Sequence, residues 1–100
     1  MTEYLSETAR KSLIDPLLDS GWTLEEGEEV LTKTFTFEDF TEAFAWMTRA
    51  SLWAKKWGHH PDWSNSYNKV RISLTSHDTG GLTARDLALA DAIDQEFSKC

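Results

Sequence analysis

The chain has 100 residues, enough for one domain with a single core, and a formal net charge of −7. This charge argues against a broad electrostatic surface for nucleic acid or for an anionic membrane. Because no long apolar run or apolar N-terminal segment occurs, and the single Cys100 cannot form an internal disulfide, we expect a cytoplasmic protein with no membrane partner.

The N-terminal third predicts one helix followed by two strands. Ser6 is a suitable N-cap for a helix over residues 7–15, and Pro16 should bend or end it before Gly21. Two short strands are expected over 21–26 and 30–37, around a turn. In the second strand apolar residues alternate with threonines, which is typical of a half-buried strand.

The strongest helical pattern lies over residues 37–57. Thr36 with Asp39 predicts a capping box, and Gly58 occupies the position expected just after a helix C-terminus. One apolar stripe recurs at spacings of three and four: Phe37, Phe40, Phe44, Met47, Ala50, Ala54 and Trp57. A second apolar line contains Ala43, Trp46 and Trp53. One sheet face cannot easily cover both, so we expect part of this helix to contact another subunit of a homodimer or homotetramer.

The C-terminal part predicts two strands within residues 62–76 and a last helix with Thr83 as N-cap and Asp86 at the capping-box position. Its buried stripe should contain Leu87, Ala90, Ile93 and Phe97. The order α-β-β-α-β-β-α predicts a single α+β domain, 1–100, with a four-stranded antiparallel sheet and helices packed on one face. The other face would be free for a site, and strand alternation places His77 on it.

Three histidines are the candidate functional residues. His59 and His60 are adjacent and precede Pro61, and His77 follows in a separate segment. They could be structural. A metal site would need converging ligands, whereas adjacent histidines tend to point apart and Pro61 favours an extended His60. Acid–base catalysis does not require converging ligands, because a single imidazole titrates near neutral pH and can transfer a proton. Aromatic walls for a flat substrate could come from Trp22, Trp57 and Trp63.

These residues resemble the signature of the pterin-4a-carbinolamine dehydratases. That signature has a charged residue, three residues, His-His-Pro, an aromatic, a histidine and an aspartate at set spacings. The matching positions are Lys55, His59-His60-Pro61, Tyr67, His77 and Asp86. The likeness extends over nearly the whole chain after the first helix. Many members carry glutamate where this chain has Lys55, so any carboxylate role at that position is absent.

The resemblance implies an enzyme that removes water from a small-molecule pterin, 4a-hydroxytetrahydropterin, to give a quinonoid dihydropterin. It implies a homo-oligomer without metal or organic cofactor, linked functionally to a pterin-dependent aromatic amino-acid hydroxylase. The catalytic roles fall to His59, His60 and His77. Substrate contacts fall to Gly58, His59, His60, Thr75, Ser76, His77 and Asp78. Supporting roles are expected for Asp86, Pro61 and Trp22.

Within this site we expect His59 and His77 to form the main acid–base pair and His60 chiefly to hold the pterin. Asp86 has two interpretations, as the cap of the last helix and as a support to the site, and we favour the cap. Two alternatives stay open. One is a non-catalytic binding, assembly or coactivator relative on the same fold, and the other is a dehydratase for a different carbinolamine.

Overall fold

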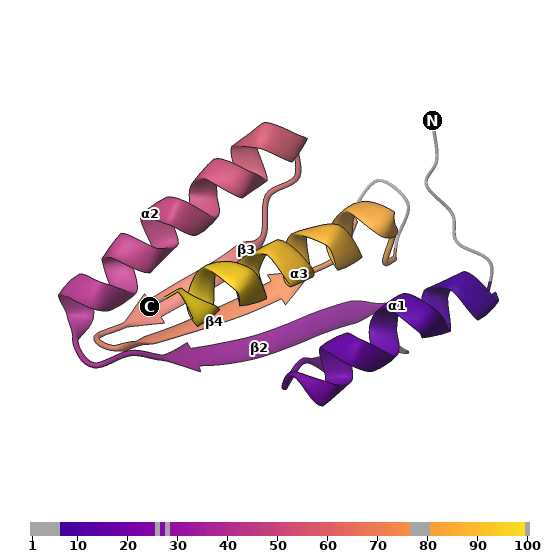
Figure 1. Ribbon diagram of the computed structural model, residues 1–100, viewed down its shortest axis with the longest axis horizontal. Coiled ribbons are helices and arrows are strands. Elements are labelled where there is room, and N and C mark those ends of the chain that lie inside the picture. Colours follow the sequence, from indigo (N-terminus) through magenta and orange to yellow (C-terminus); the bar gives the residue numbers. More distant parts are fainter. Residues whose placement is uncertain (1–6, 26, 28, 77–80, 100) are drawn as a thin grey trace.

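The computed structural model describes residues 7–25, 27, 29–76 and 81–99. Three helices and four strands follow in the predicted order, α-β-β-α-β-β-α (Figure 1). The elements are α1 (Glu7–Asp19), β1 (Thr23–Glu25), β2 (Val30–Thr36), α2 (Phe40–Trp57), β3 (Asp62–Ser66), β4 (Lys69–Leu74) and α3 (Ala84–Ser98). Pro16 lies inside α1, which continues to Asp19.

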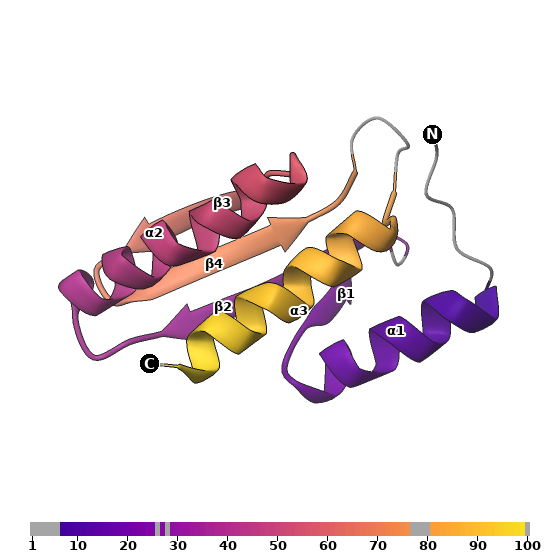
Figure 2. The same ribbon diagram turned by 45° about the horizontal axis from the view of Figure 1, so that its top comes forward.

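The strands form one antiparallel sheet in the order β1-β2-β4-β3. Figures 1 and 2 show α2 and α3 side by side over one face of this sheet, with α1 on the other side of α3 from α2. The central strands pair Leu31 with Leu74 and Phe35 with Val70, and all four side chains are buried beneath the helices. The predicted α+β fold, with helices on one sheet face, is therefore confirmed.

Helix α2 begins three residues later than the capping-box prediction places it. Asp39 is the N-cap, and its carboxylate accepts a hydrogen bond of 2.9 Å from the backbone N–H of Glu42. Thr36 is instead the last residue of β2, where it pairs with Lys69. The prediction of Thr36 as the cap is wrong because β2 continues through Thr36 and three more residues precede the first helical residue, Phe40.

The buried face of α2 combines residues of both apolar lines: Ala43 and Trp46 from the second, and Ala50 and Ala54 from the first. Trp46 is 0% exposed, and its ring packs 4.7 Å from that of Phe35 and 5.2 Å from that of Phe37 between ring centroids. Phe40 and Phe44 are 46% and 55% exposed. Both lines have the same helical period, so the pattern alone could not show which of their members face the core. Three alanines let α2 approach closely around Trp46: Ala43, Ala50 and Ala54.

Trp53 also finds its partner within the chain. Its indole N–H donates a hydrogen bond of 2.9 Å to Glu96 of α3, and its ring lies 5.4 Å from that of Trp57. Trp46 and Trp53 are therefore accommodated within one chain, which removes the sequence argument for an oligomer, while the oligomer itself stays a prediction. In the described part of the chain, no helix is both long and apolar enough to cross a membrane.

Candidate active site

His59 is placed by the way in which α2 ends. Gly58 adopts the left-handed conformation, with φ 62° and ψ 30°, that glycine reaches at low cost. Its N–H bonds to the carbonyl of Lys55, and the N–H of His59 bonds to the carbonyl of Ala54, at 3.2 and 3.0 Å. This pair of bonds is a Schellman motif, and it turns the chain so that His59 leaves the helix in a defined direction.

The imidazole of His59 contacts the carboxylate of Asp86, although 27 residues separate them in the chain. The two atoms that meet are Nε2 of His59 and Oδ1 of Asp86. The side chain of Asp86 is 0% exposed and that of His59 is 12% exposed. A buried carboxylate requires compensating hydrogen bonds, so its other contacts determine how firmly it holds the imidazole.

Those other contacts all reach Oδ2 of Asp86. The hydroxyl of Ser76 donates to it at 2.7 Å, and the backbone N–H of Thr83 donates at 2.9 Å. The second bond is the carboxylate half of a capping box at the start of α3. Asp86 therefore has both roles considered from the sequence, because it caps α3 with one oxygen and holds His59 with the other.

Ser76 lies just after β4 and is itself fixed on both sides. It forms an isolated antiparallel bridge with Gly81, with N–O distances of 3.1 and 3.2 Å, and its hydroxyl lies 3.0 Å from that of Thr83. The residue is 4% exposed. Its hydroxyl and backbone groups are thus engaged inside the protein, where they connect the end of β4 with the start of α3.

Glu29 forms a second connection at the same end of the sheet, which the sequence did not reveal. Its carboxylate accepts a hydrogen bond of 2.9 Å from the backbone N–H of Leu82, and it forms an ion pair of 3.2 Å with Arg10 of α1. The hydroxyl of Thr75 donates to the Glu29 carbonyl at 2.9 Å. A glutamate in a predicted turn carries no pattern that would indicate these contacts.

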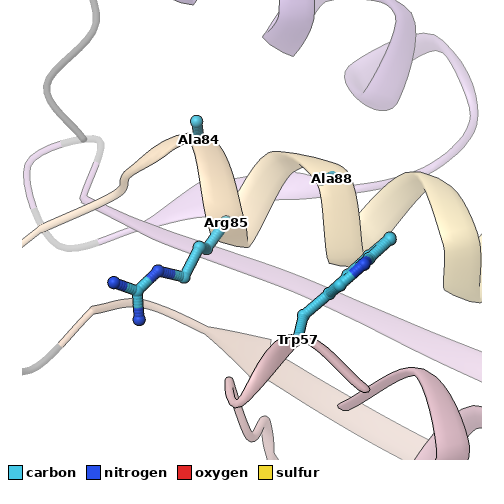
Figure 3. Close-up of a pocket in the computed structure, with 4 residues that line it drawn as sticks. All are labelled: Trp57, Ala84, Arg85 and Ala88. Carbon is cyan, nitrogen blue, oxygen red and sulfur yellow. The ribbon is translucent and has the colours of Figure 1, made fainter. Parts of the chain in front are cut away.

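An open pocket of about 340 Å³ lies between the end of α2 and the first turns of α3. Figure 3 shows Trp57 reaching from the end of α2 towards α3, on whose successive turns Ala84, Arg85 and Ala88 lie. Trp57 lies two residues before His59, and Arg85 is the chain neighbour of Asp86, although neither member of the pair is among the lining residues. An aromatic wall, small alanines and a guanidinium group suit a flat ring with polar edges.

The remaining predicted site residues differ in exposure, and two of them are not described by the structure. His60 and Gly58 are exposed, Pro61 is half-buried, and His77 and Asp78 lie outside the described residues. His59 and Asp86 meet where α2 ends and α3 begins. The expected place on the free sheet face concerned His77, so it stays a prediction.

Trp22 makes its described contacts away from the His59–Asp86 pair. Its indole N–H donates to Asp94 at 3.0 Å, and its ring packs against that of Phe35 in the core. Asp94 lies eight residues beyond Asp86 on α3, or roughly 12 Å along the helix axis. The supporting role expected for Trp22 therefore stays a prediction without a contact to this pair.

A metal centre finds no support among the described side chains. Within residues 7–25, 27, 29–76 and 81–99, no three histidine, cysteine, aspartate or glutamate side chains converge as metal ligands would. The His59–Asp86 pair instead resembles an oriented acid–base group, in which a carboxylate fixes one ring nitrogen and leaves the other for chemistry.

Comparison with known proteins gives the same fold and a family. The pterin 4 alpha carbinolamine dehydratase family matches residues 3–96. A Roseobacter denitrificans protein named for this activity is 50% identical over 94% of this chain and 96% of its own. The Drosophila melanogaster pterin-4-alpha-carbinolamine dehydratase is 45% identical over 94% of this chain, which spans 49% of that longer protein.

Two solved structures share the architecture. The transcriptional coactivator/pterin dehydratase from Brucella melitensis is 36% identical, with a TM-score of 0.82 over 92% of this chain and 96% of its own. A pterin dehydratase-like protein described as a RuBisCO assembly factor in the alpha-carboxysome is 21% identical, with a TM-score of 0.65 over 76% of this chain and 88% of its own, a likeness of fold alone. From the family match and these identities, the chain belongs to the pterin-4a-carbinolamine dehydratases, a family of hydro-lyases.

Proposed function

We propose that the protein dehydrates 4a-hydroxytetrahydropterin to quinonoid dihydropterin and water by histidine acid–base catalysis. The observation that carries the proposal is the His59 imidazole, which is held against a buried carboxylate beside a pocket with an aromatic wall. Family membership supports the substrate class. A separate reductase would return the product to tetrahydropterin. The enzyme would thus recycle the pterin that an aromatic amino-acid hydroxylase uses.

The reaction needs two proton transfers and no redox step. The N5–H bond breaks and its electrons form the C4a=N5 double bond, while the C4a–O bond breaks and the hydroxyl leaves as water after gaining a proton. Imidazole suits both transfers near neutral pH. We assign one to His59 and, following the family signature, the other to His77. His60, exposed and next to His59, is assigned to holding the pterin.

The structure favours different roles for the other predicted contact residues. Gly58 shapes the chain that carries His59, and the exposed edge of this turn is suited to a backbone contact with the pterin. Thr75 and Ser76 have side-chain hydroxyls that are engaged with Glu29 and Asp86. We therefore assign Thr75 and Ser76 to shaping the site and do not assign their side-chain hydroxyls to substrate contacts.

A direct assay tests the proposal. Freshly made 4a-hydroxytetrahydropterin dehydrates slowly by itself, and its conversion can be followed by ultraviolet absorbance. We expect the wild-type protein to accelerate this conversion and His59→Ala to lose most of the acceleration. A folded wild-type protein that leaves the rate unchanged would favour the non-catalytic alternative on the same fold.

We further propose that no metal or organic cofactor takes part, since both proton transfers can be performed by imidazole. Activity should survive exhaustive chelation followed by gel filtration into metal-free buffer. The control is the same protein dialysed without chelator. Loss of activity on chelation, with recovery after one equivalent of zinc, would contradict this proposal.

A homo-oligomer, dimer or tetramer, is also proposed, on different grounds from those the sequence indicated. Three apolar side chains on the outer side of α2 are strongly exposed, with Phe40 at 46%, Phe44 at 55% and Leu52 at 64%. They fall on one i, i+4 row of the helix, the kind of ridge that packs against another helix.

A further inference from the structure

We infer that His59 exchanges protons with the substrate through Nδ1, and that Ser76 is a positioning residue that fixes this choice through Asp86. The inference rests on the proposed function and deepens it. It states which ring nitrogen of His59 exchanges protons with the substrate and which buried hydroxyl fixes the His59 tautomer. Both points follow from the hydrogen bonds around a single carboxylate.

The orientation of Asp86 is determined by the donors at Oδ2. Ser76 and the backbone N–H of Thr83 both donate to this oxygen, at 2.7 and 2.9 Å. A hydroxyl has one hydrogen, so with the Ser76 hydrogen on Asp86 we take the Thr83 hydroxyl as the donor in its 3.0 Å contact with Ser76 Oγ; the same hydroxyl lies 3.4 Å from Oδ2. Donors therefore run in one direction, from Thr83 to Ser76 to Asp86, and all of them end at Oδ2.

Oδ1 is consequently the oxygen that faces His59. Because Oδ2 is occupied by donors, any proton shared between the two side chains lies between Oδ1 and Nε2. A neutral imidazole carries its hydrogen on one nitrogen only, so a donated Nε2–H leaves Nδ1 as the acceptor. Among the described residues, none forms a recorded hydrogen bond with Nδ1 of His59, and the side chain retains 12% exposure.

Ser76 is the residue best placed to keep this arrangement. If the Ser76 hydroxyl is removed, Oδ2 of Asp86 keeps only Thr83 as a partner, through its N–H at 2.9 Å and its more distant hydroxyl at 3.4 Å. The carboxylate could then rotate and present either oxygen to His59. Ser76 cannot shift easily, because its bridge to Gly81 fixes its backbone. The hydroxyl thus acts on the reaction through Asp86 without touching the substrate.

Nitrogen-15 NMR of histidine-labelled protein tests the ring state directly. Long-range nitrogen–proton correlation distinguishes a protonated from an unprotonated ring nitrogen, and the His59 signals are assigned by their absence in His59→Ala. We expect the neutral ring of His59 to carry its hydrogen on Nε2. A neutral ring with its hydrogen on Nδ1 would overturn the inference, whatever the activity of the protein.

Asp86→Asn is the variant that should reverse the tautomer. Its amide oxygen can still accept from Ser76 and Thr83, which turns the NH₂ group towards Nε2 and makes that nitrogen the acceptor. The hydrogen should move to Nδ1, and kcat should fall roughly 10²–10⁴-fold. An unchanged tautomer together with near wild-type kcat would overturn the inference.

Ser76→Ala tests the positioning role, with Ser73→Ala as the matched control. Ser73 lies on β4 with its side chain on the other face of the sheet, 3.2 Å from Arg71. We expect Ser76→Ala to lower kcat about tenfold with little change in KM, and to give a mixture of His59 tautomers. Ser73→Ala should match the wild type in all three measurements.

The two proposals fail in different ways. An active wild type whose His59 carries its hydrogen on Nδ1 would overturn the inference and leave the proposed function standing. An inactive wild type would overturn both. Should Ser76→Ala lose activity while keeping a pure Nε2–H ring, the positioning role would be wrong, because Ser76 would then act in another way.

Discussion

His59 and Asp86 meet at the point where α2 ends and α3 begins, with Nε2 of the imidazole against Oδ1 of the carboxylate. Each residue is fixed by the terminus of its own helix. His59 follows a Schellman motif, and Asp86 belongs to a capping box. Helix-ending bonds that any protein of this size needs therefore also set the geometry of the candidate catalytic pair.

The first prediction separates the adjacent histidines by kinetics. His59→Ala should lower kcat by up to 10²–10⁴-fold, the usual contribution of a positioned acid or base, or by somewhat less if another histidine compensates. His60→Ala should mainly raise KM, because an exposed residue that only holds the pterin contributes similar binding in ground and transition states. Steady-state rates over a substrate series decide this. A larger kcat loss in His60→Ala than in His59→Ala would reverse the assignment.

A second prediction concerns Gly81, where an added Cβ would lie 2.0 Å from Oε1 of Glu29. Gly81→Ala should push the Glu29 carboxylate away from the Leu82 N–H and from Arg10, destabilising the protein by about 1–3 kcal/mol. Urea unfolding measures this free energy. The control is the double-mutant cycle with Glu29→Ala, in which Gly81→Ala should cost much less because the clash is gone. Equal costs in both backgrounds would refute the explanation.

The third prediction is a pH dependence at Glu96. The Trp53 indole N–H lowers the pKa of the Glu96 carboxyl, with help from Lys99 and Arg49 and against the opposing effect of burial. A lowered pKa in the folded state stabilises the protein above the ordinary glutamate pKa, and this stabilisation is lost as pH falls through the lowered value.

Trp53→Phe removes that donor and keeps most of the ring. The difference in unfolding free energy between Trp53→Phe and wild type should therefore be larger at neutral pH than at about pH 3. Glu96→Gln provides the control background, in which the difference should not depend on pH. If the difference in unfolding free energy between Trp53→Phe and wild type, both with Glu96 intact, does not depend on pH, then Trp53 acts through packing alone.

Oligomerisation is the subject of the fourth prediction. Phe44→Lys places a charge in the exposed apolar row on α2, and it should shift the protein towards monomer in sedimentation experiments at micromolar concentration. Ser64→Lys, at an exposed position of β3 on the open face of the sheet, adds the same charge elsewhere and should leave the assembly unchanged. A wild-type protein that sediments as a monomer would contradict the proposed homo-oligomer.

Much of the fold was predictable because its patterns are local. Alternation with threonine identified β2, the glycine at 58 marked the end of α2, and Thr83 with Asp86 marked the start of α3. The His-His-Pro signature could be located for the same reason, since it immediately follows a recognisable helix terminus. Antiparallel pairing followed from the short connections between strands.

Features that depend on contacts distant in sequence were not predictable. Two apolar lines on α2 share one period, and packing against Phe35 and Phe37 buries Trp46 while Phe40 and Phe44 stay exposed. The contact from Ser76 to Asp86 requires the end of β4 and the start of α3 to lie together, which no spacing reveals.

The double role of Asp86 links activity to the least stable part of a helix. Helix ends fray before helix centres, and the first turn of α3 contains the carboxylate that orients His59. Warming should open that turn before the sheet and the Trp46 core unfold. Heat would then inactivate the enzyme reversibly at temperatures where its circular dichroism still reports a folded protein, and bound substrate would protect activity by holding the turn closed.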